Sequence, residues 1–158
     1  MSNASDERIK IIKKIQDWLR PEGWVVEIIN QPNYEFAIQV KQNVNSGFFV
    51  LVQKEVDRVI ILTRIGFSIE DRNSYKLSKN KKQFWLNLKT NLILLGVMTK
   101  ITPDLDNLET IELNRVIYFD GMDSKDKFFE NITKVTDALA LCNLAFEQFK
   151  SSISPSNQ

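Results

Sequence analysis

The sequence contains no histidine and a single cysteine, Cys142, among its 158 residues. Without histidine, the Ser-His-Asp and Cys-His arrangements that activate a nucleophile cannot form. One cysteine excludes an intrachain disulfide and leaves too few nitrogen and sulfur ligands for a zinc site. A lone thiol also fits a reducing compartment. We therefore expect no metal and no cofactor, and any enzymatic activity would have to rely on carboxylates, lysine, tyrosine or serine.

Glycine and long apolar runs are also scarce. Five glycines, with no GxGxxG or GxxxxGK[ST] pattern, leave no common phosphate-binding loop. The longest uninterrupted apolar run, LILLGVM at 92–98, is too short to cross a bilayer. A formal net charge of +1 provides no overall field that would attract nucleic acid or an anionic membrane. These absences favour a globular domain that binds neither nucleic acid nor membrane.

The pattern of apolar residues predicts one α+β domain over residues 7–150. The start, MSNA, resembles a cloning remnant, so residues 1–6 are expected outside the fold, and 151–158 are expected to form a flexible tail. The order α-β-β-β-β-α-β-β-α implies an antiparallel sheet flanked by helices. The predicted helices cover 7–19, 84–95 and 125–150, and the predicted strands cover 24–29, 34–40, 48–52, 58–65, 97–102 and 110–119.

Two of the predicted strands differ in their patterning. The strand at 34–40 alternates, which places Tyr34 on the same face as Phe36, Ile38 and Val40. The strand at 48–52, FFVLV, is apolar on both faces. Such a strand is expected at the centre of a sheet that is covered on both sides.

Three positions carry helix-boundary signals. Ser68, followed by Asp71, can begin a short helix within the ambiguous segment 66–80. Asn80 and Gln83 have the spacing of a capping box. Gly96 follows the helix predicted at 84–95, at the place where a left-handed residue commonly ends a helix.

The last predicted helix is apolar on nearly every side in its second half. One stripe, which includes Cys142, has heptad spacing and suits a helix lying on a sheet, so this thiol is expected in the core. Other faces carry additional apolar residues, and an all-round apolar helix needs a second cover. That cover is either another helix or another subunit. We expect a homodimer, with a partner surface at Ala138, Leu141, Leu144 and Ala145.

The strand VIYF at 116–119 runs into Asp120, Asp123 and Asp126. The favoured interpretation is structural: Asp120-Gly121 forms a turn, Asp123 or Ser124 caps the last helix, and Asp126 lies in its positive first turn. An alternative is a carboxylate- and magnesium-dependent phosphatase or nuclease. It is disfavoured because Asp120 and Asp123 are separated by two residues, whereas DxD enzymes have one.

A charge asymmetry extends from just before the second predicted helix to the beginning of the third. Residues 76–103 hold six lysines and no acid, whereas 104–130 hold eight acids and three bases. The two segments either neutralise each other in the fold, or the cluster forms a patch that binds nucleic acid or another anionic ligand. Nucleic acid is the weaker choice, because no aromatic residues alternate with the lysines. The residues of this electrostatic patch are Lys76, Lys79, Lys81 and Lys82.

The segments FWLNLKTNLILLGV and VIYFDGMDSKDKFFENITKV, within the element order above, resemble an uncharacterised, mainly archaeal domain-of-unknown-function family with a type III secretion chaperone-like fold. The likeness covers about residues 7–149. One departure is the run of four strands at 24–65, where secretion chaperones usually have three. The resemblance implies a cytoplasmic, non-enzymatic protein, often dimeric, that binds polypeptide. Our leading hypothesis is therefore a protein-binding module, with chaperone-like action as its narrower form.

Overall fold

The computed structural model describes residues 4–44 and 46–153. Its elements follow the predicted order, with one additional short helix before the central helix and two 3-10 turns. They are α1 (Ala4–Leu19), η1 (Arg20–Glu22), β1 (Val25–Ile28), β2 (Tyr34–Asn43), β3 (Ser46–Gln53), β4 (Arg58–Gly66), α2 (Ile69–Leu77), α3 (Lys81–Leu94), β5 (Met98–Thr102), β6 (Thr110–Tyr118), η2 (Phe119–Gly121) and α4 (Lys125–Ile153).

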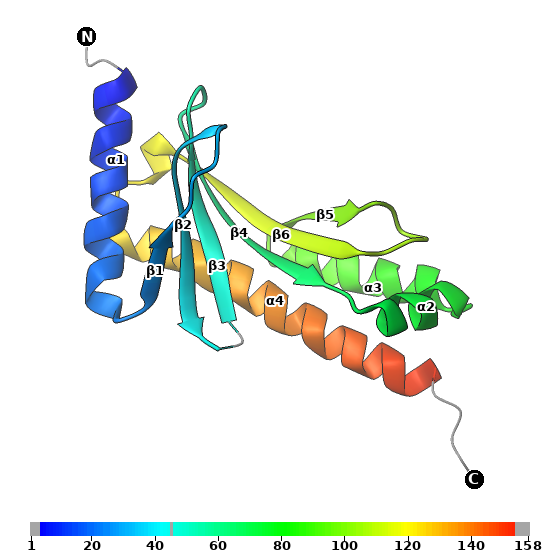
Figure 1. Cartoon of the computed structure of the whole chain (residues 1–158). Coiled ribbons are helices and arrows are strands. Elements are labelled where there is room, and N and C mark those ends of the chain that lie inside the picture. Colours follow the sequence, from blue (N-terminus) through cyan, green and yellow to red (C-terminus); the bar gives the residue numbers. More distant parts are fainter. Residues whose placement is uncertain (1–3, 45, 154–158) are drawn as a thin grey trace.

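The six strands form one antiparallel sheet in the order β1-β2-β3-β4-β6-β5. The long helix α4 runs along one side of this sheet, from α1 at one end to α2 and α3 at the other (Figure 1). The helices are segregated from the strands, so the α+β class is confirmed. None of the helices in the described part of the chain is long and apolar enough to cross a membrane.

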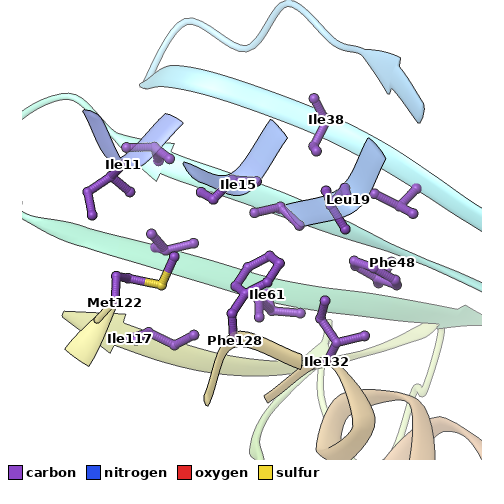
Figure 2. Close-up of a cluster of buried hydrophobic side chains, with 14 of the residues drawn as sticks. Ile11, Ile15, Leu19, Ile38, Phe48, Ile61, Ile117, Met122, Phe128 and Ile132 are labelled. Atoms are coloured by element: carbon purple, nitrogen blue, oxygen red, sulfur yellow. The ribbon is translucent and has the colours of Figure 1, made fainter. Parts of the chain in front are cut away.

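Two apolar clusters lie between the sheet and the helices. The first joins α1, the first half of α4 and the side chains of β2, β3 and β4 that point toward them. Figure 2 shows Ile15 of α1, Phe48 of β3 and Phe128 of α4 converging in this cluster. The second joins α2, α3 and the second half of α4 to the inner face of β6. Because α4 belongs to both clusters, it holds the two halves of the domain together.

The second cluster explains why α4 is apolar on several sides. The ring of Phe146 contacts the ring of Phe67, the residue that follows β4, with centroids 4.5 Å apart. It also contacts the ring of Phe84 on α3, with centroids 4.8 Å apart. Tyr75 of α2 contacts Phe149 at 5.9 Å. The second cover of α4 is therefore supplied largely by helices of the same chain, the first of the two possibilities left open by the sequence. Cys142 lies fully buried in this cluster, as predicted.

Several boundaries and caps differ from the prediction. Helix α1 begins at Ala4 and α4 continues to Ile153, so both extend beyond the limits of 7–150; residues 1–3 and 154–158 lie outside the described residues. The Ser68 cap is confirmed, because its Oγ accepts a hydrogen bond from the Asp71 amide at 3.1 Å. The capping box is wrong, because the Asn80 side chain makes no capping hydrogen bond.

The face predicted for Tyr34 is also wrong. A register shift lies between Tyr34 and Phe36 in the pairing of β2 with β3. Such an irregularity reverses the direction of the side chains on one side of it. Phe36, Ile38 and Val40 therefore face the helices, while Tyr34 belongs to a third apolar cluster on the opposite face of the sheet.

Candidate functional site

The structure separates the four residues that the sequence assigned to a partner surface. Ala138 is 0% exposed inside the second cluster, so its assignment to an exposed surface is wrong. The cause is the close packing of α4 on the sheet at this small residue. Leu141 and Ala145 are half-buried, and Leu144 is 58% exposed. These three residues line one wall of a groove between α3 and α4.

The α3–α4 groove has a volume of about 480 Å³. Its lining extends from Asn80 to Asn91 on α3 and from Leu141 to Ser152 on α4. At about 1.5 Å of rise per residue, each wall is about 16 Å long, which equals three helical turns. The lining residues are Asn80, Gln83, Phe84, Asn87, Leu88, Asn91, Leu141, Leu144, Ala145, Gln148, Phe149 and Ser152.

The floor of the groove is apolar and firmly packed. Leu88 and Phe149 are buried, and the ring of Phe84 lies 4.4 Å from that of Phe149. Leu144 stands at the margin with most of its side chain in solvent. An apolar ligand seated here would remove the exposed side of Leu144 from water, at about 25 cal/mol per Å² of apolar surface.

The rim of the groove is formed by neutral amides. Oδ1 of Asn87 accepts a hydrogen bond from Nε2 of Gln83 at 2.9 Å. The main-chain carbonyl oxygen of Asn87 accepts one from Nδ2 of Asn91 at 3.0 Å. Each amide side chain offers both donors and an acceptor. The rim therefore matches partners that carry both kinds of group, as polypeptides do.

Among the described residues, none that lines the groove is charged. The hydroxyl of Ser152, at one end of the described lining, donates to the main-chain carbonyl oxygen of Phe149 at 2.7 Å. A general acid, a general base or an activated nucleophile requires an ionisable group, and a phosphate site requires positive charge. The described lining residues therefore offer apolar contacts and neutral hydrogen-bonding groups.

The aspartates after β6 have the structural roles that were favoured from the sequence. Asp120 lies in η2, and Oδ2 of Asp123 accepts a hydrogen bond from Lys127 at 2.9 Å, which lowers the pKa of Asp123. Ser124, not Asp123, caps α4, since its Oγ accepts from the Lys127 amide at 3.2 Å. Within residues 4–44 and 46–153, no group of three or more His, Cys, Asp or Glu side chains could hold a metal ion.

The lysine cluster faces the acidic loop that follows β5. Nζ of Lys81 lies 3.0 Å from Oδ1 of Asp106, while Lys76, Lys79 and Lys82 are exposed. A hydrogen bond from Asn107 lowers the pKa of Asp104, and the charge of Lys76 contributes to the same shift. The opposite charges of the two segments therefore partly neutralise each other, which is one of the two outcomes expected.

The fold defines the class of protein: an α+β domain whose helices lie on one face of an open six-stranded antiparallel sheet. The chain belongs to the family described as "Uncharacterized conserved protein (DUF2299)", whose model matches residues 11–146. No curated protein matches it. A crystal structure of an uncharacterized protein from Methanothermobacter thermautotrophicus is similar, with a TM-score of 0.76 and 23% identity over 88% of this chain and 99% of that chain.

The likeness to the archaeal structure concerns the fold alone. It agrees with the resemblance to an uncharacterised archaeal domain that the sequence indicated. The type III secretion chaperone-like label for this fold stays a prediction.

Sequence reasoning found the α4 wall of the groove and missed the α3 wall. Gln83, Asn87 and Asn91 are spaced by four residues, which places their side chains on one face of a helix. That spacing is a signal for a polar rim. These amides become the rim of a groove only because the apolar stripe of α4 lies next to α3 in the fold. The sequence alone does not show that the two helices are neighbours.

Proposed function

We propose that the protein is a non-enzymatic protein-binding module whose α3–α4 groove receives the apolar side of a helix from a partner protein. The observation that carries this proposal is the composition of the groove. An apolar floor with an amide rim, and no charged side chain among the described lining residues, suits a polypeptide. Chaperone-like action is a narrower form of the same proposal.

The shape of the groove favours a helical segment as the occupant. A groove of about three turns between two helices is the setting in which an amphipathic helix binds, with anchors at positions i, i+3, i+4 and i+7. Leu144 would contact such anchors at the margin, and Phe84 and Leu88 would contact them at the floor. The amides of Asn87 and Gln148 would face the polar flanks of the bound helix.

The two alternative functions have less support. Lys81 is paired with Asp106 at 3.0 Å, which reduces the positive charge that a nucleic acid or anionic ligand would meet. Among the described residues, Asp120 and Asp123 belong to no group of three or more carboxylate, thiol or imidazole side chains that could hold a metal ion. A steep fall of nucleic-acid affinity with salt would favour the first alternative, and turnover of phosphate esters would favour the second.

The test is affinity co-purification from a lysate of the source organism, with mass spectrometry of the retained proteins. Wild type is compared with Leu144→Asp, which places a charge at the groove margin. Leu86→Asp is the matched control, since Leu86 is a leucine of α3 that is 59% exposed and does not line the groove. Thermal unfolding of both variants checks that they fold.

The proposal expects one partner protein that wild type and Leu86→Asp retain and that folded Leu144→Asp loses at least tenfold. Equal retention by the folded Leu144→Asp variant would overturn it. Failure of wild type to retain any protein above a blank resin would overturn it as well.

A further inference from the structure

A small pocket lies where the junction of α2 and α3 meets the loop between β5 and β6, at the end of the domain opposite α1 (Figure 1). Its volume is about 250 Å³, roughly that of eight water molecules. Its described lining shares no residue with the α3–α4 groove. We refer to it as the α2–α3 pocket. It is lined by Tyr75 of α2, by Lys81, Lys82 and Trp85 of α3, and by Leu105 and Asp106 of the loop.

Tyr75 brings a hydroxyl without a partner to this pocket. The residue is only 4% exposed, and its hydroxyl forms no hydrogen bond with any described residue. Burial, together with the negative charge of Asp106, raises the pKa of Tyr75 above its ordinary value of 10.0. At neutral pH the group is therefore a hydroxyl that can donate a hydrogen bond. Because Asp106 lines the pocket, its influence on Tyr75 places the hydroxyl on the pocket side of the ring.

Trp85 brings a second donor without a partner. It is 7% exposed, and its indole N–H forms no hydrogen bond with any described residue. Neither this atom nor the Tyr75 hydroxyl is sealed from solvent, since Nε of Arg8 is the one fully enclosed, unpartnered side-chain atom in the described part of the chain. The pocket is therefore where donors from two otherwise buried residues can meet a ligand.

One positive charge at the pocket is unbalanced. Nζ of Lys81 lies 3.0 Å from Oδ1 of Asp106 and 3.4 Å from the main-chain carbonyl oxygen of Lys76, so the protein itself holds this lysine. Lys82 is exposed and forms no ion pair or hydrogen bond with any described residue. The pairing of Lys81 weakens the lysine cluster as a surface for a polyanion. It leaves Lys82 available to a small anion.

The beginning of α3 adds to this positive charge. The helix starts with two consecutive lysines, has no acidic residue in its first turn, and receives no capping hydrogen bond from the Asn80 side chain. The N-terminus of a helix carries partial positive charge, so lysines there are unfavourable for the helix by itself. An anion bound beside Lys82 would relieve this accumulation of positive charge.

The chemistry of the lining selects the kind of anion. Lys82, Tyr75 and Trp85 offer an ammonium group and two neutral donors, which suit the oxygen atoms of a carboxylate. A single unbalanced charge matches a monoanion, whereas phosphate carries more charge and is commonly bound by the fork of an arginine. The indole ring of Trp85 and the side chain of Leu105 supply apolar walls for a flat hydrocarbon body.

We propose that the α2–α3 pocket binds a small aromatic monocarboxylate, with Lys82, Tyr75 and Trp85 as the donors to its carboxylate. The aromatic body of the ligand lies against Trp85 and Leu105. This site does not depend on the proposed partner of the α3–α4 groove, because the two sites are lined by different residues.

The test is titration of the full chain with benzoate, followed by the indole N–H resonances in heteronuclear NMR spectra. The chain has three tryptophans, and Trp85→Phe identifies the resonance of Trp85. A saturable shift of this resonance is expected, while those of Trp18 and Trp24, in the first cluster, should stay in place. Benzamide has the shape of benzoate without its charge, and inorganic phosphate has charge without an apolar body. Each should bind at least about tenfold more weakly than benzoate.

Two lysine variants separate the pocket from the surrounding cluster. Lys82→Met removes the unbalanced charge and should weaken benzoate binding at least about tenfold. Lys79→Met is the matched control, since Lys79 is an exposed lysine of the same cluster that does not line the pocket, and it should weaken binding less than about threefold. Tyr75→Phe keeps the ring in the second cluster, removes the hydroxyl, and should also weaken binding.

Three results would overturn the proposal. The first is the absence of a saturable shift of the Trp85 resonance at millimolar benzoate. The second is equal affinity for benzoate and benzamide. The third is equal weakening by folded Lys82→Met and Lys79→Met, which would indicate diffuse attraction to the lysine cluster. The groove variant Leu144→Asp should bind benzoate as wild type does, so failure of this site and failure of the proposed function are told apart.

Discussion

The guanidinium of Arg115 donates a hydrogen bond from Nη1 to the main-chain carbonyl oxygen of Gly96 at 2.6 Å. The same atom lies 3.3 Å from the carbonyl oxygen of Leu95, and Nε donates to Oδ1 of Asn131 on α4. These carbonyl groups end α3, where the helix has unpaired acceptors and partial negative charge. One half-buried side chain of β6 therefore joins the sheet to both helices that form the groove.

Replacing Arg115 by Met is expected to lower the free energy of unfolding by about 2 kcal/mol, because partly buried acceptors lose a charged donor. Urea unfolding measures the loss. The matched control is Arg20→Met: Arg20 is largely exposed, its partner Asp17 lies 3.6 Å away, and a loss below about 0.5 kcal/mol is expected. Equal losses for the two variants would contradict this role of Arg115.

Gly96 is expected to tolerate no side chain. Its φ of +68° is left-handed, and an added Cβ would lie 2.6 Å from Nη1 of Arg115. Gly96→Ala should therefore cost at least about 1–2 kcal/mol in unfolding free energy. Gly66→Ala is the control, since no atom lies within 4 Å of its added Cβ and its φ is not positive. A Gly96→Ala variant as stable as Gly66→Ala would refute the requirement for glycine.

The position of Gly96 shows what local sequence signals can determine. A glycine after an apolar helix has few other interpretations, and the predicted helix end is confirmed by its φ and by the hydrogen bond from the Val97 amide to Leu92. Ser68 was identified on the same grounds. Signals of this kind act within four or five residues, where the chain brings the partners together without help from the fold.

The misplaced residues depended on contacts between distant parts of the chain. Tyr34 changes face because of a register irregularity against β3, which the alternation of β2 alone does not reveal. Ala138 is buried because α4 packs on the sheet there. The all-round apolar character of α4 had two explanations, and the positions of α2 and α3 against it favour cover by helices of the same chain. Only the α4 wall of the groove was predicted, for the same reason. The amides of α3 can be recognised as the second wall only once α3 is known to lie beside α4.

Cys142 is expected to be inert toward thiol reagents in the folded protein. Burial raises the pKa of its thiol to about 12, and the thiolate is the reactive species. At pH 8 a chromogenic disulfide reagent should react at least about a hundredfold more slowly with native protein than with protein in denaturant. Similar rates in the two conditions would show that the second apolar cluster is open to solvent.

The same burial makes stability depend on alkaline pH. The pKa of Cys142 is higher in the folded state, so the unfolded chain loses this proton first as the pH rises from about 9 toward 12. Ionisation then favours unfolding by up to about 1.4 kcal/mol per pH unit. Cys142→Ala removes this contribution, so the difference in unfolding free energy between wild type and variant should shift in favour of the variant between pH 9 and 11. A constant difference would contradict burial of the thiol.

At acid pH the relevant contact is between Asp71 of α2 and Lys150 of α4, whose charged atoms lie 3.1 Å apart. Hydrogen bonds from Ser68 and Lys150 lower the pKa of Asp71 below its ordinary value of 3.8. A carboxyl with a lowered folded-state pKa stabilises the fold above its unfolded pKa, and the stabilisation disappears as the pH falls through the folded value.

Asp71→Asn should therefore be less stable than wild type at pH 7, by no more than about 1 kcal/mol because the pair is partly exposed to solvent. The difference should vanish below the folded-state pKa, where wild type carries a neutral carboxyl. Thermal unfolding across this pH range measures it. Because Lys150→Met removes one partner of the carboxylate, Asp71→Asn should have a smaller effect in that background, and an undiminished effect would assign the stabilisation to Ser68 alone.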